Sequence, residues 1–327
     1  MSFINPILKA TGKLNNLCLT LCVVGSRKIY TADDFGASPW HIFAPNLKIY
    51  GIDADPEACE QANAALAAQR IDWFEQHYPL AFGGEVGQST LYVTHAVHCS
   101  SLYLPNAEYV SRFQGFSTGL SLEASIEVET TTLDEFAKRE AIEAIDVLKV
   151  DVQGADLDVL RGGKDIIHKS TLAVVVEVEF SEVYKGQPLF SDIDQYLRQQ
   201  GFVLFDLVTE DAWCRLPRQF SPVRSQRRAG QLLWADAIYF RDLLQDNAQV
   251  QHLYSPESLL KLGAIADAFE FPDYALEILT HLTLNHGQDQ RWNCRQEILS
   301  ALENVKSVIE ADFETLPIVK MLSQPCA

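Results

Sequence analysis

Short apolar runs alternate with amphipathic stretches over the first two-thirds of the chain. Most of these runs end at a glycine or an acidic residue, which is typical of buried strands in a parallel sheet. The stretches between them repeat apolar residues at helical spacing. This pattern predicts buried strands at 17–24, 48–53, 146–151, 172–179, 202–207 and 231–240.

Helix-start signals separate several of these strands. Asp55 precedes Pro56, Thr132 opens a capping box, and Ser191 precedes a helix that should stop at Gly201. Strands that alternate with helices in this way imply right-handed crossovers and a mostly parallel sheet covered on both faces. We also expect a loop with at most a short helix at 26–46, and less buried, alternating strands at 85–94 and 126–131.

The pattern becomes helical throughout near the end of the chain. Apolar residues recur at helical spacing from about residue 255, with proline and glycine breaks between the segments. We therefore predict an α/β domain at 1–245 and a helical C-terminal extension at 246–327. The spacing does not decide whether these helices form a homo-oligomer, cover a pocket or dock a partner.

Composition and charge narrow the classes of partner. The 327 residues are 47% hydrophobic and carry 26 basic against 44 acidic side chains, a formal net charge of −18. Such a field repels nucleic acid and anionic membranes, so neither is expected as a partner. Seven cysteines without a C-x-x-C pair favour a reducing compartment and no metal site. We expect a cytoplasmic protein.

The predicted sheet places several residues at one edge, because ligands bind beyond the carboxyl ends of parallel strands. Gly25, flanked by Val24 and Ser26, follows the first strand, and Asp53 and Ala54 end the second. A carboxylate there typically holds the two hydroxyls of a ribose. The alternative is that Asp53 caps the following helix. One glycine in place of G-x-G-x-x-G disfavours a dinucleotide and suits a nucleoside such as S-adenosylmethionine.

Further carboxylates follow the next two strands. Asp151 ends one of them and faces the expected ligand, where it would hold the ligand's amino-acid portion, orient a reacting hydroxyl or bind a divalent ion. Glu177 and Glu179 lie two residues apart on one face of the other strand. The alternative for this glutamate pair is a structural salt bridge to Lys149 or an arginine.

Several motifs resemble the FkbM family of S-adenosylmethionine-dependent methyltransferases. Their order and spacing match over about residues 17–240, and the most specific block is K-V-D-V-Q-G-A-D at 149–156. The others are C-S-S-L-Y at 99–103, T-T-L-D-E-F at 131–136 and E-V-E-F at 177–180. The resemblance implies a class I methyltransferase sheet of seven strands, the last antiparallel, and methyl transfer from S-adenosylmethionine to a hydroxyl of a sugar, glycan or small metabolite.

The resemblance also implies roles for individual residues. Asp151 and Glu177 would be catalytic, Ser101 would line the donor pocket, and Glu179 would contact the acceptor. One departure concerns the first strand, where the family usually has Asp-x-Gly and this chain has Val23-Val24-Gly25. Asp33, Asp34 and Gly36 are candidates to replace the missing carboxylate. The departure keeps two alternatives open, a binding scaffold without catalysis and, less favoured, an NAD-dependent oxidoreductase.

An arginine-rich loop stands out in the acidic chain. It contains Arg215, Arg218, Arg224, Arg227 and Arg228 before the strand at 231–240. If that strand returns antiparallel, the loop lies at the carboxyl edge of the sheet. Arg227 and Arg228 would then bind an anionic acceptor through bidentate contacts. The alternative is a solvated linker.

Overall fold

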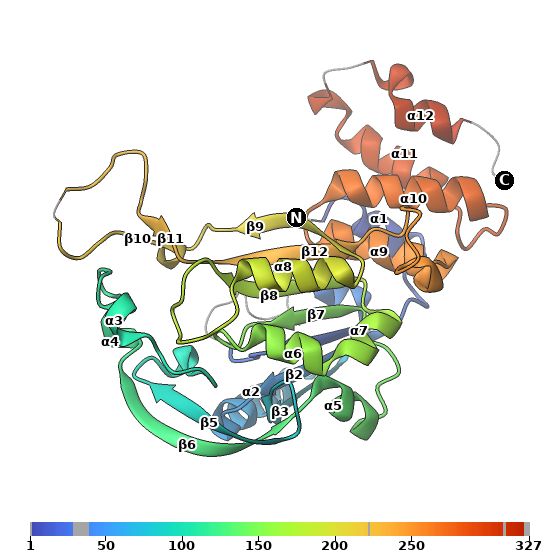
Figure 1. Ribbon diagram of the computed structural model, residues 1–327. Helices are drawn as coiled ribbons and strands as arrows, with labels where there is room; N and C mark the ends of the chain where they lie inside the picture. The colour runs from blue at the N-terminus through green and yellow to red at the C-terminus, as the bar shows by residue number, and fades with distance from the viewer. Residues whose placement is uncertain (1, 29–38, 222, 310–311, 324–327) are drawn as a thin grey trace.

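A seven-stranded sheet forms the centre of the protein (Figure 1). The computed structural model describes residues 2–28, 39–221, 223–309 and 312–323. The strand order is β3-β2-β1-β7-β8-β12-β9. In this order the bounds are Phe74–Pro79, Leu47–Asp53, Leu19–Val24, Val147–Val150, Ala173–Glu179, Trp234–Arg241 and Phe202–Val208.

The strand directions confirm the predicted fold class, a mostly parallel α/β sheet whose last strand is antiparallel. β1, β2, β3, β7 and β8 pair in parallel, whereas β12 runs antiparallel to both β8 and β9. Every residue of β8 is buried because helices cover both faces of the sheet.

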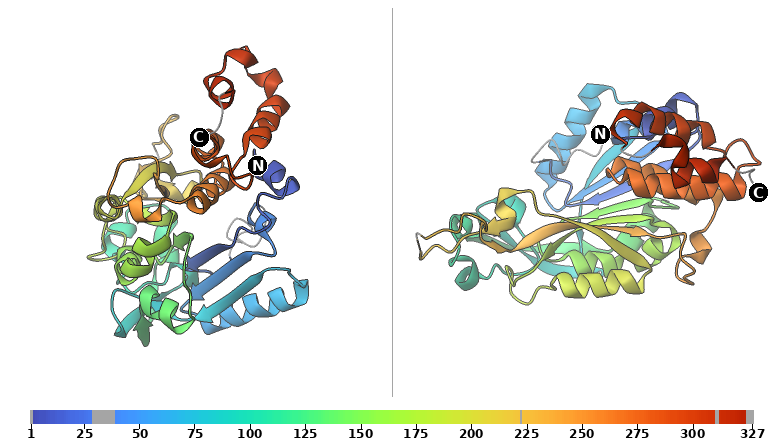
Figure 2. Two further views of the ribbon diagram at one scale, coloured as in Figure 1. Left: turned by 90° about the vertical axis from the view of Figure 1, so that its right-hand side faces the viewer. Right: turned by 90° about the horizontal axis from the view of Figure 1, so that it is seen from above.

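Two apolar cores fill the space on either side of this sheet. One contains side chains of α5 (Leu133–Arg139), α6 (Asp156–Gly162), α7 (Lys164–Ser170) and α8 (Phe190–Gln199). The other joins the sheet to α1 (Asn5–Ala10), α9 (Pro256–Ala268), α10 (Pro272–His286), α11 (Arg295–Asn304) and α12 (Pro317–Leu322). Figure 2 shows α9, α10 and α11 on the face opposite α6, α7 and α8. The remaining long helix, α2 (Pro56–Gln69), packs against β2 and β3.

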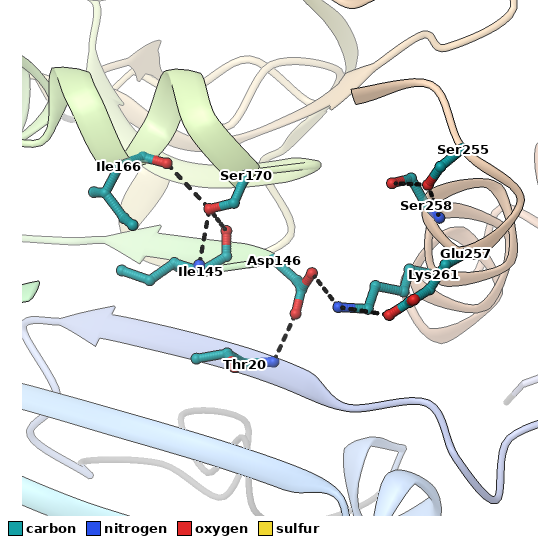
Figure 3. Close-up of polar contacts among 9 residues, drawn as sticks. All are labelled: Thr20, Ile145, Asp146, Ile166, Ser170, Ser255, Glu257, Ser258 and Lys261. Carbon is teal, nitrogen blue, oxygen red and sulfur yellow. Dashed lines mark hydrogen bonds and ion pairs between the residues drawn. The ribbon is translucent and has the colours of Figure 1, made fainter. Parts of the chain in front are cut away.

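A buried ion pair links α9 to the sheet (Figure 3). Lys261 Nζ lies 2.9 Å from Asp146 Oδ1, and the other carboxylate oxygen of Asp146 accepts the backbone N–H of Thr20 at 2.8 Å. Asp146 directly precedes β7, so one carboxylate connects the start of β7, the start of β1 and the C-terminal helices. The helices beyond residue 245 thus share a core and a polar contact with the sheet, and the division at 245 stays a prediction.

A second sheet lies beside the carboxyl end of the main one. It has the order β4-β6-β5, with bounds Ala81–Phe82, Leu122–Thr131 and Gly87–Thr94. β5 is an edge strand, as its alternating pattern predicts. Two one-turn helices, α3 (Ala107–Val110) and α4 (Phe116–Gly119), connect β5 to β6. A two-residue ladder of β10 (Arg215–Leu216) and β11 (Gln231–Leu232) closes the arginine-rich loop at its base.

Local differences from the sequence-based expectations have simple physical reasons. The helix α8 begins after Leu189, whose N–H donates to the Asp192 carboxylate, so Ser191 lies inside the helix and does not cap it. The strand β3 was not predicted, because its sequence F-E-Q-H-Y-P is mostly polar. As predicted, Asp55 caps α2 and Thr132 caps α5. Among the described residues, no helix is long and apolar enough to cross a bilayer.

Candidate active site

A cavity of about 930 Å³ opens at the carboxyl edge of the main sheet. Its volume lies in the range of ~300–1,000 Å³ that is usual for small-molecule sites. Residues from the ends of β1, β2, β7 and β8 and from the start of β12 line it. Among the predicted site residues, the lining includes Val24, Gly25, Asp53, Ala54, Ser101, Asp151, Glu177 and Glu179.

Gly25 is required where β1 meets β7. Its φ of +84° is a conformation that side chains disfavour, and a Cβ atom there would lie 1.9 Å from the carbonyl oxygen of Asp151. The missing side chain therefore allows the backbone at the end of β1 to contact the backbone at Asp151, after β7. Ser26 turns away instead, because its hydroxyl hydrogen-bonds His77 Nδ1 at 2.8 Å and the residue is 5% exposed. Ser26 does not line the cavity.

The two aspartates after β2 have different partners. Asp55 caps α2 by accepting the N–H of Glu57, and it also pairs with Arg27. Asp53 lines the cavity, and its Oδ1 accepts the N–H of Asp55 at 2.9 Å. Burial raises the pKa of Asp53, and the hydrogen bond from Asp55 and the charge of Arg27 partly offset this. The helix cap is thus supplied by Asp55, which leaves the Asp53 carboxylate at the cavity wall.

The amide of Gln153 connects the two predicted catalytic carboxylates. Its Nε2 donates to Asp151 Oδ1 at 3.0 Å and to Glu177 Oε2 at 2.7 Å. Its Oε1 lies 2.9 Å from the Tyr184 hydroxyl, and its carbonyl oxygen accepts the Ser101 hydroxyl at 2.6 Å. Gln153 lies in the turn after β7 with a φ of +59°. These contacts align Asp151 with Glu177 across adjacent strands.

Burial and the negative charge of neighbouring carboxylates disfavour the ionisation of three carboxyl groups at this edge. Burial, followed by the charge of Asp151, raises the pKa of Glu177 well above its ordinary value. Burial and then Asp156 do the same for the pKa of Glu179, whose Oε2 is buried without a hydrogen-bond partner in the described structure. Burial and then Asp151 raise the pKa of Asp156 to about 7, although the N–H groups of Val152 and Gly154 donate to it. Burial and mutual repulsion thus make these groups harder to ionise than exposed carboxyls.

Ser101 is placed as predicted, but its hydroxyl is already engaged. It donates to Gln153 and accepts the N–H of Tyr103 at 2.9 Å, and the residue is 1% exposed. Ser101 therefore lines the cavity and supports the turn that carries Gln153.

The structure does not bring Arg227 and Arg228 to the cavity. Both are exposed, and neither belongs to its lining. The β10–β11 ladder turns the loop outward, so that it projects from the sheet (Figure 1). Arg218, by contrast, packs at the base of the loop, where its guanidinium lies 4.2 Å from the ring centroid of Phe113. The candidates Asp33, Asp34 and Gly36 lie outside the described residues.

Many residues of the lining were not predicted as site residues, and four of them have side chains or positions that matter for the site. They are Gln153 in its connecting role, Trp213, Trp234 and Asp236. Asp236 lies opposite Glu177 and Trp234 opposite Glu179 in the β8–β12 ladder. A polar residue inside the apolar run of β12 was an available signal for Asp236. Trp213 follows an irregular segment, and the sequence contains no signal that it lines the cavity.

No group of three or more potential ligands among the described residues is arranged to hold a metal ion. The carboxylates instead contact backbone N–H groups, the Gln153 amide and Lys149, whose Nζ lies 3.8 Å from Asp151 Oδ2.

The strand order with β12 inserted antiparallel, and the cavity at the carboxyl ends of β1, β2 and β7, define a class I methyltransferase fold. The sequence profile of the methyltransferase FkbM domain matches residues 33–204, which is more than half of the chain. The protein belongs to the FkbM methyltransferase family.

Individual relatives match over shorter stretches or with low identity. A 2-O-methyltransferase, NoeI, from Sinorhizobium fredii is 41% identical over 70 residues, which cover 21% of this chain and 28% of that relative. The crystal structure of an FkbM methyltransferase from Methylobacillus flagellatus is similar with a TM-score of 0.38 and 11% identity, covering 68% of this chain and 43% of that one. For the magnesium protoporphyrin IX methyltransferase of Synechocystis the TM-score is 0.33 at 10% identity, with 73% and 76% covered.

Proposed function

We propose that the protein is an S-adenosylmethionine-dependent O-methyltransferase that methylates a hydroxyl of a sugar, glycan or small metabolite. One observation carries the proposal: Asp53, Gly25 and Asp151, from three adjacent strands, line one cavity in a chain of the FkbM family. O-methylation is supported by the partial match to a 2-O-methyltransferase.

The residues at the β2–β1–β7 end of the cavity fit this cofactor. Gly25 and Asp53 both line this end of the cavity, and the Asp53 carboxylate accepts hydrogen bonds from the backbone N–H groups of Asp55 and Arg27. Carboxylates outnumber the two basic side chains, Arg27 and Lys149, among the described lining residues. An excess of acidic groups attracts a cation, and S-adenosylmethionine carries a sulfonium. When bound, this cofactor supplies a methyl group that an oxygen nucleophile can displace.

Each residue then has a defined task. Asp53 accepts hydrogen bonds from the two ribose hydroxyls. Asp151 Oδ2, on the side of the carboxylate that Gln153 leaves free, accepts the proton of the acceptor hydroxyl. Glu177 orients the acceptor, and burial raises the pKa of its carboxyl group.

A catalytically inactive scaffold is the second candidate, and one feature favours it. The last residues of β1 are Val23 and Val24, both buried, so this strand end offers no carboxylate for the methionine portion of the donor. Such a scaffold would keep the fold and lose donor affinity.

Isothermal titration calorimetry separates these candidates. We expect S-adenosylmethionine and its demethylated product, S-adenosylhomocysteine, to bind at micromolar levels and NAD not to bind. Binding of none of the three would favour the scaffold, and binding of NAD alone would favour an oxidoreductase. Transfer of a labelled methyl group from S-adenosylmethionine to a hydroxyl compound would be measured next. A labelled product that is stable to base is an ether and not an ester, and it would establish methylation of a hydroxyl.

A further inference from the structure

A buried imidazole contacts the turn of residues 25–27 that follows β1. Ser26 is the middle residue of this turn, and its hydroxyl lies 2.8 Å from Nδ1 of His77 in β3. Ser26 is 5% exposed and His77 is 4% exposed. Gly25 and Arg27, on either side of Ser26, line the cavity, whereas Ser26 and His77 do not. The imidazole therefore contacts the donor end of the cavity from behind its lining.

The imidazole reaches this turn by crossing β2. In the strand order β3-β2-β1, His77 lies opposite Gly51 of β2, and Gly51 lies opposite Val23 of β1. A Cβ on Gly51 would stand 2.3 Å from His77 Nδ1, so the ring occupies the place of the missing side chain. A glycine inside a buried strand often marks such a close approach. His77 of the edge strand can thus contact a residue at the end of β1.

Polar contacts fix both the backbone and the ring of His77. Its backbone N–H and C=O pair with the side-chain amide of Asn63 in α2, at 2.8 Å each. Its Nε2 lies 3.3 Å from Glu75 Oε1. A carboxylate can only accept a hydrogen bond, so Nε2 carries the proton, and Nδ1 of the neutral ring accepts the Ser26 hydroxyl. Glu75 thus selects the tautomer that binds Ser26.

Glu75 is itself held as a carboxylate. Its side chain is 1% exposed, and it accepts hydrogen bonds from Lys28 Nζ at 2.8 Å and from Trp73 Nε1 at 2.9 Å. Burial alone would raise the pKa of Glu75, but these contacts and the one from His77 outweigh it and lower the pKa to about 2. A buried polar network whose members are satisfied is rigid. The network therefore gives the contact with Ser26 a fixed anchor.

The end of β1 supplies no such anchor of its own. Its last residues are Val23 and Val24, which are buried and apolar. The N–H groups of Gly25 and Ser26 both donate to the carbonyl oxygen of Ile52, at 2.8 and 2.9 Å. These two bonds tie the turn to β2, and the side chain that fixes the turn comes from β3.

We propose that His77 is a positioning residue for the donor site, and that it acts through Ser26 to hold residues 25–27 in the conformation that accepts the nucleoside. This inference rests on the proposed function and deepens it, because it assigns donor affinity to a buried residue of the edge strand. His77 acts only through the turn. Without the contact the turn samples other conformations, and the apparent affinity falls with the fraction of molecules that keep the competent one.

Two substitutions of His77 separate the two ends of its ring. Asparagine carries its amide near the position of Nδ1 and glutamine near that of Nε2. His77→Asn therefore keeps the contact with Ser26, whereas His77→Gln keeps only the contact with Glu75. Calorimetric titration with S-adenosylhomocysteine should show at least about fivefold weaker binding to His77→Gln and to Ser26→Ala, as expected for one lost hydrogen bond. His77→Asn should recover most of the affinity.

The double variant Ser26→Ala/His77→Gln should bind no more weakly than either single variant, because both changes remove the same contact. Ser170→Ala is the matched control. Its hydroxyl accepts the N–H of Ile145 at 2.9 Å near the start of β7, and Ser170 does not line the cavity. This variant should unfold at a lower temperature and keep the donor affinity of the wild type.

Amide hydrogen exchange measures the turn without a ligand. The protection factors of the Gly25 and residue-26 N–H groups should be at least about fivefold lower in His77→Gln and Ser26→Ala than in the wild type. Thermal unfolding of each variant shows that it is folded under the conditions of both measurements.

Unchanged protection of the turn in His77→Gln and Ser26→Ala would overturn the inference. A loss of donor affinity as large in Ser170→Ala or in His77→Asn would also overturn it, because it would indicate a general loss of stability. If the wild type does not bind S-adenosylhomocysteine but the variants lose protection, the proposed function is refuted and His77 still holds the turn. If all variants bind this nucleoside as the wild type does, the proposed function stands and the inference is refuted.

Discussion

At the scale of single residues, the site depends on Gly25 and on the amide of Gln153. Gly25 allows the ends of β1 and β7 to touch, and Gln153 joins two carboxylates that would otherwise repel each other. Neither role is visible in the chain alone. Glycine after a strand is commonly only a turn, and the sequence contains no signal that the glutamine at 153 connects two strands. Its contacts with β8 and with Tyr184 depend on long-range packing.

Substitution of Gly25 by alanine should destabilise the protein by about 3 kcal/mol or more, because the new Cβ would collide with backbone and φ is positive. Gly186→Ala is the matched control. Gly186 has a similar φ of +74°, but nothing lies within 4 Å of its Cβ position. That variant should lose only about 1 kcal/mol. Urea unfolding of both measures the difference, and equal losses would contradict the close approach of β1 and β7.

The buried carboxyls predict a pH dependence of stability. The folded-state pKa values of Glu177, Glu179 and Asp156 are raised, so the folded state binds more protons than the unfolded one. Their contribution is fully present below the ordinary pKa of about 4, and it is lost as pH rises through the raised values. The free energy of unfolding should therefore fall between about pH 5 and pH 8.

Glu179→Gln should flatten this fall by about 1 to 3 kcal/mol, because it removes one of the titrating groups. Glu60→Gln, at an exposed position of α2, is the control and should keep the wild-type slope. The measurement is urea unfolding at several pH values. If Glu179→Gln keeps the wild-type slope, Glu179 does not carry a raised pKa in the folded protein.

At the scale of elements, hydrophobic runs determined the predictions that were confirmed. Six strands of the main sheet follow apolar runs, and their order along the chain with intervening helices was enough to predict a parallel sheet. The edge strand β3 was not predicted because most of its residues are polar. The predicted cap of α8 was wrong because the Asp192 carboxylate, in the first turn of the helix, accepts the N–H of Leu189. Of the site, Asp53, Asp151 and Glu177 followed from strand ends, whereas Trp213 lies in a segment without periodicity.

The ion pair that joins α9 to β7 yields a prediction at the same scale. Lys261→Met leaves the buried Asp146 without its cation and should cost about 3 to 5 kcal/mol. Adding Asp146→Asn should recover most of the loss, because no carboxylate then remains to be desolvated. Urea unfolding of the two single variants and the double variant gives the coupling energy.

Lys138→Met serves as the control for the loss of a lysine, because the pair of Lys138 with Glu135 is exposed. Its effect on the free energy of unfolding should be small. A double variant as unstable as Lys261→Met alone would show that the pair does not connect α9 to the sheet.

At the scale of the whole molecule, one apolar core runs from the sheet into the C-terminal helices. Leu21 and Val175 of the sheet belong to the same buried cluster as Leu262 of α9 and Ile278 of α10. The helices thus cover a face of the sheet that would otherwise be exposed to water.

The shared core predicts that the full chain unfolds in a single transition, and that residues 1–245 alone expose an apolar face. Calorimetric scanning of the full chain and dye binding by the truncated chain measure these outcomes. Two separate transitions, or a stable 1–245 fragment that binds no hydrophobic dye, would instead support independent domains.

The central claim is that a nucleoside lies across the ends of β1 and β2 with its ribose held by Asp53. Calorimetric titration of S-adenosylhomocysteine into the wild type, Asp53→Ala and the exposed control Asp72→Asn tests it most directly. We expect micromolar binding to the wild type and to the control, and at least about tenfold weaker binding to Asp53→Ala, since two charge-assisted hydrogen bonds are lost. Equal affinity in all three proteins, or no binding to the wild type, would contradict the claim.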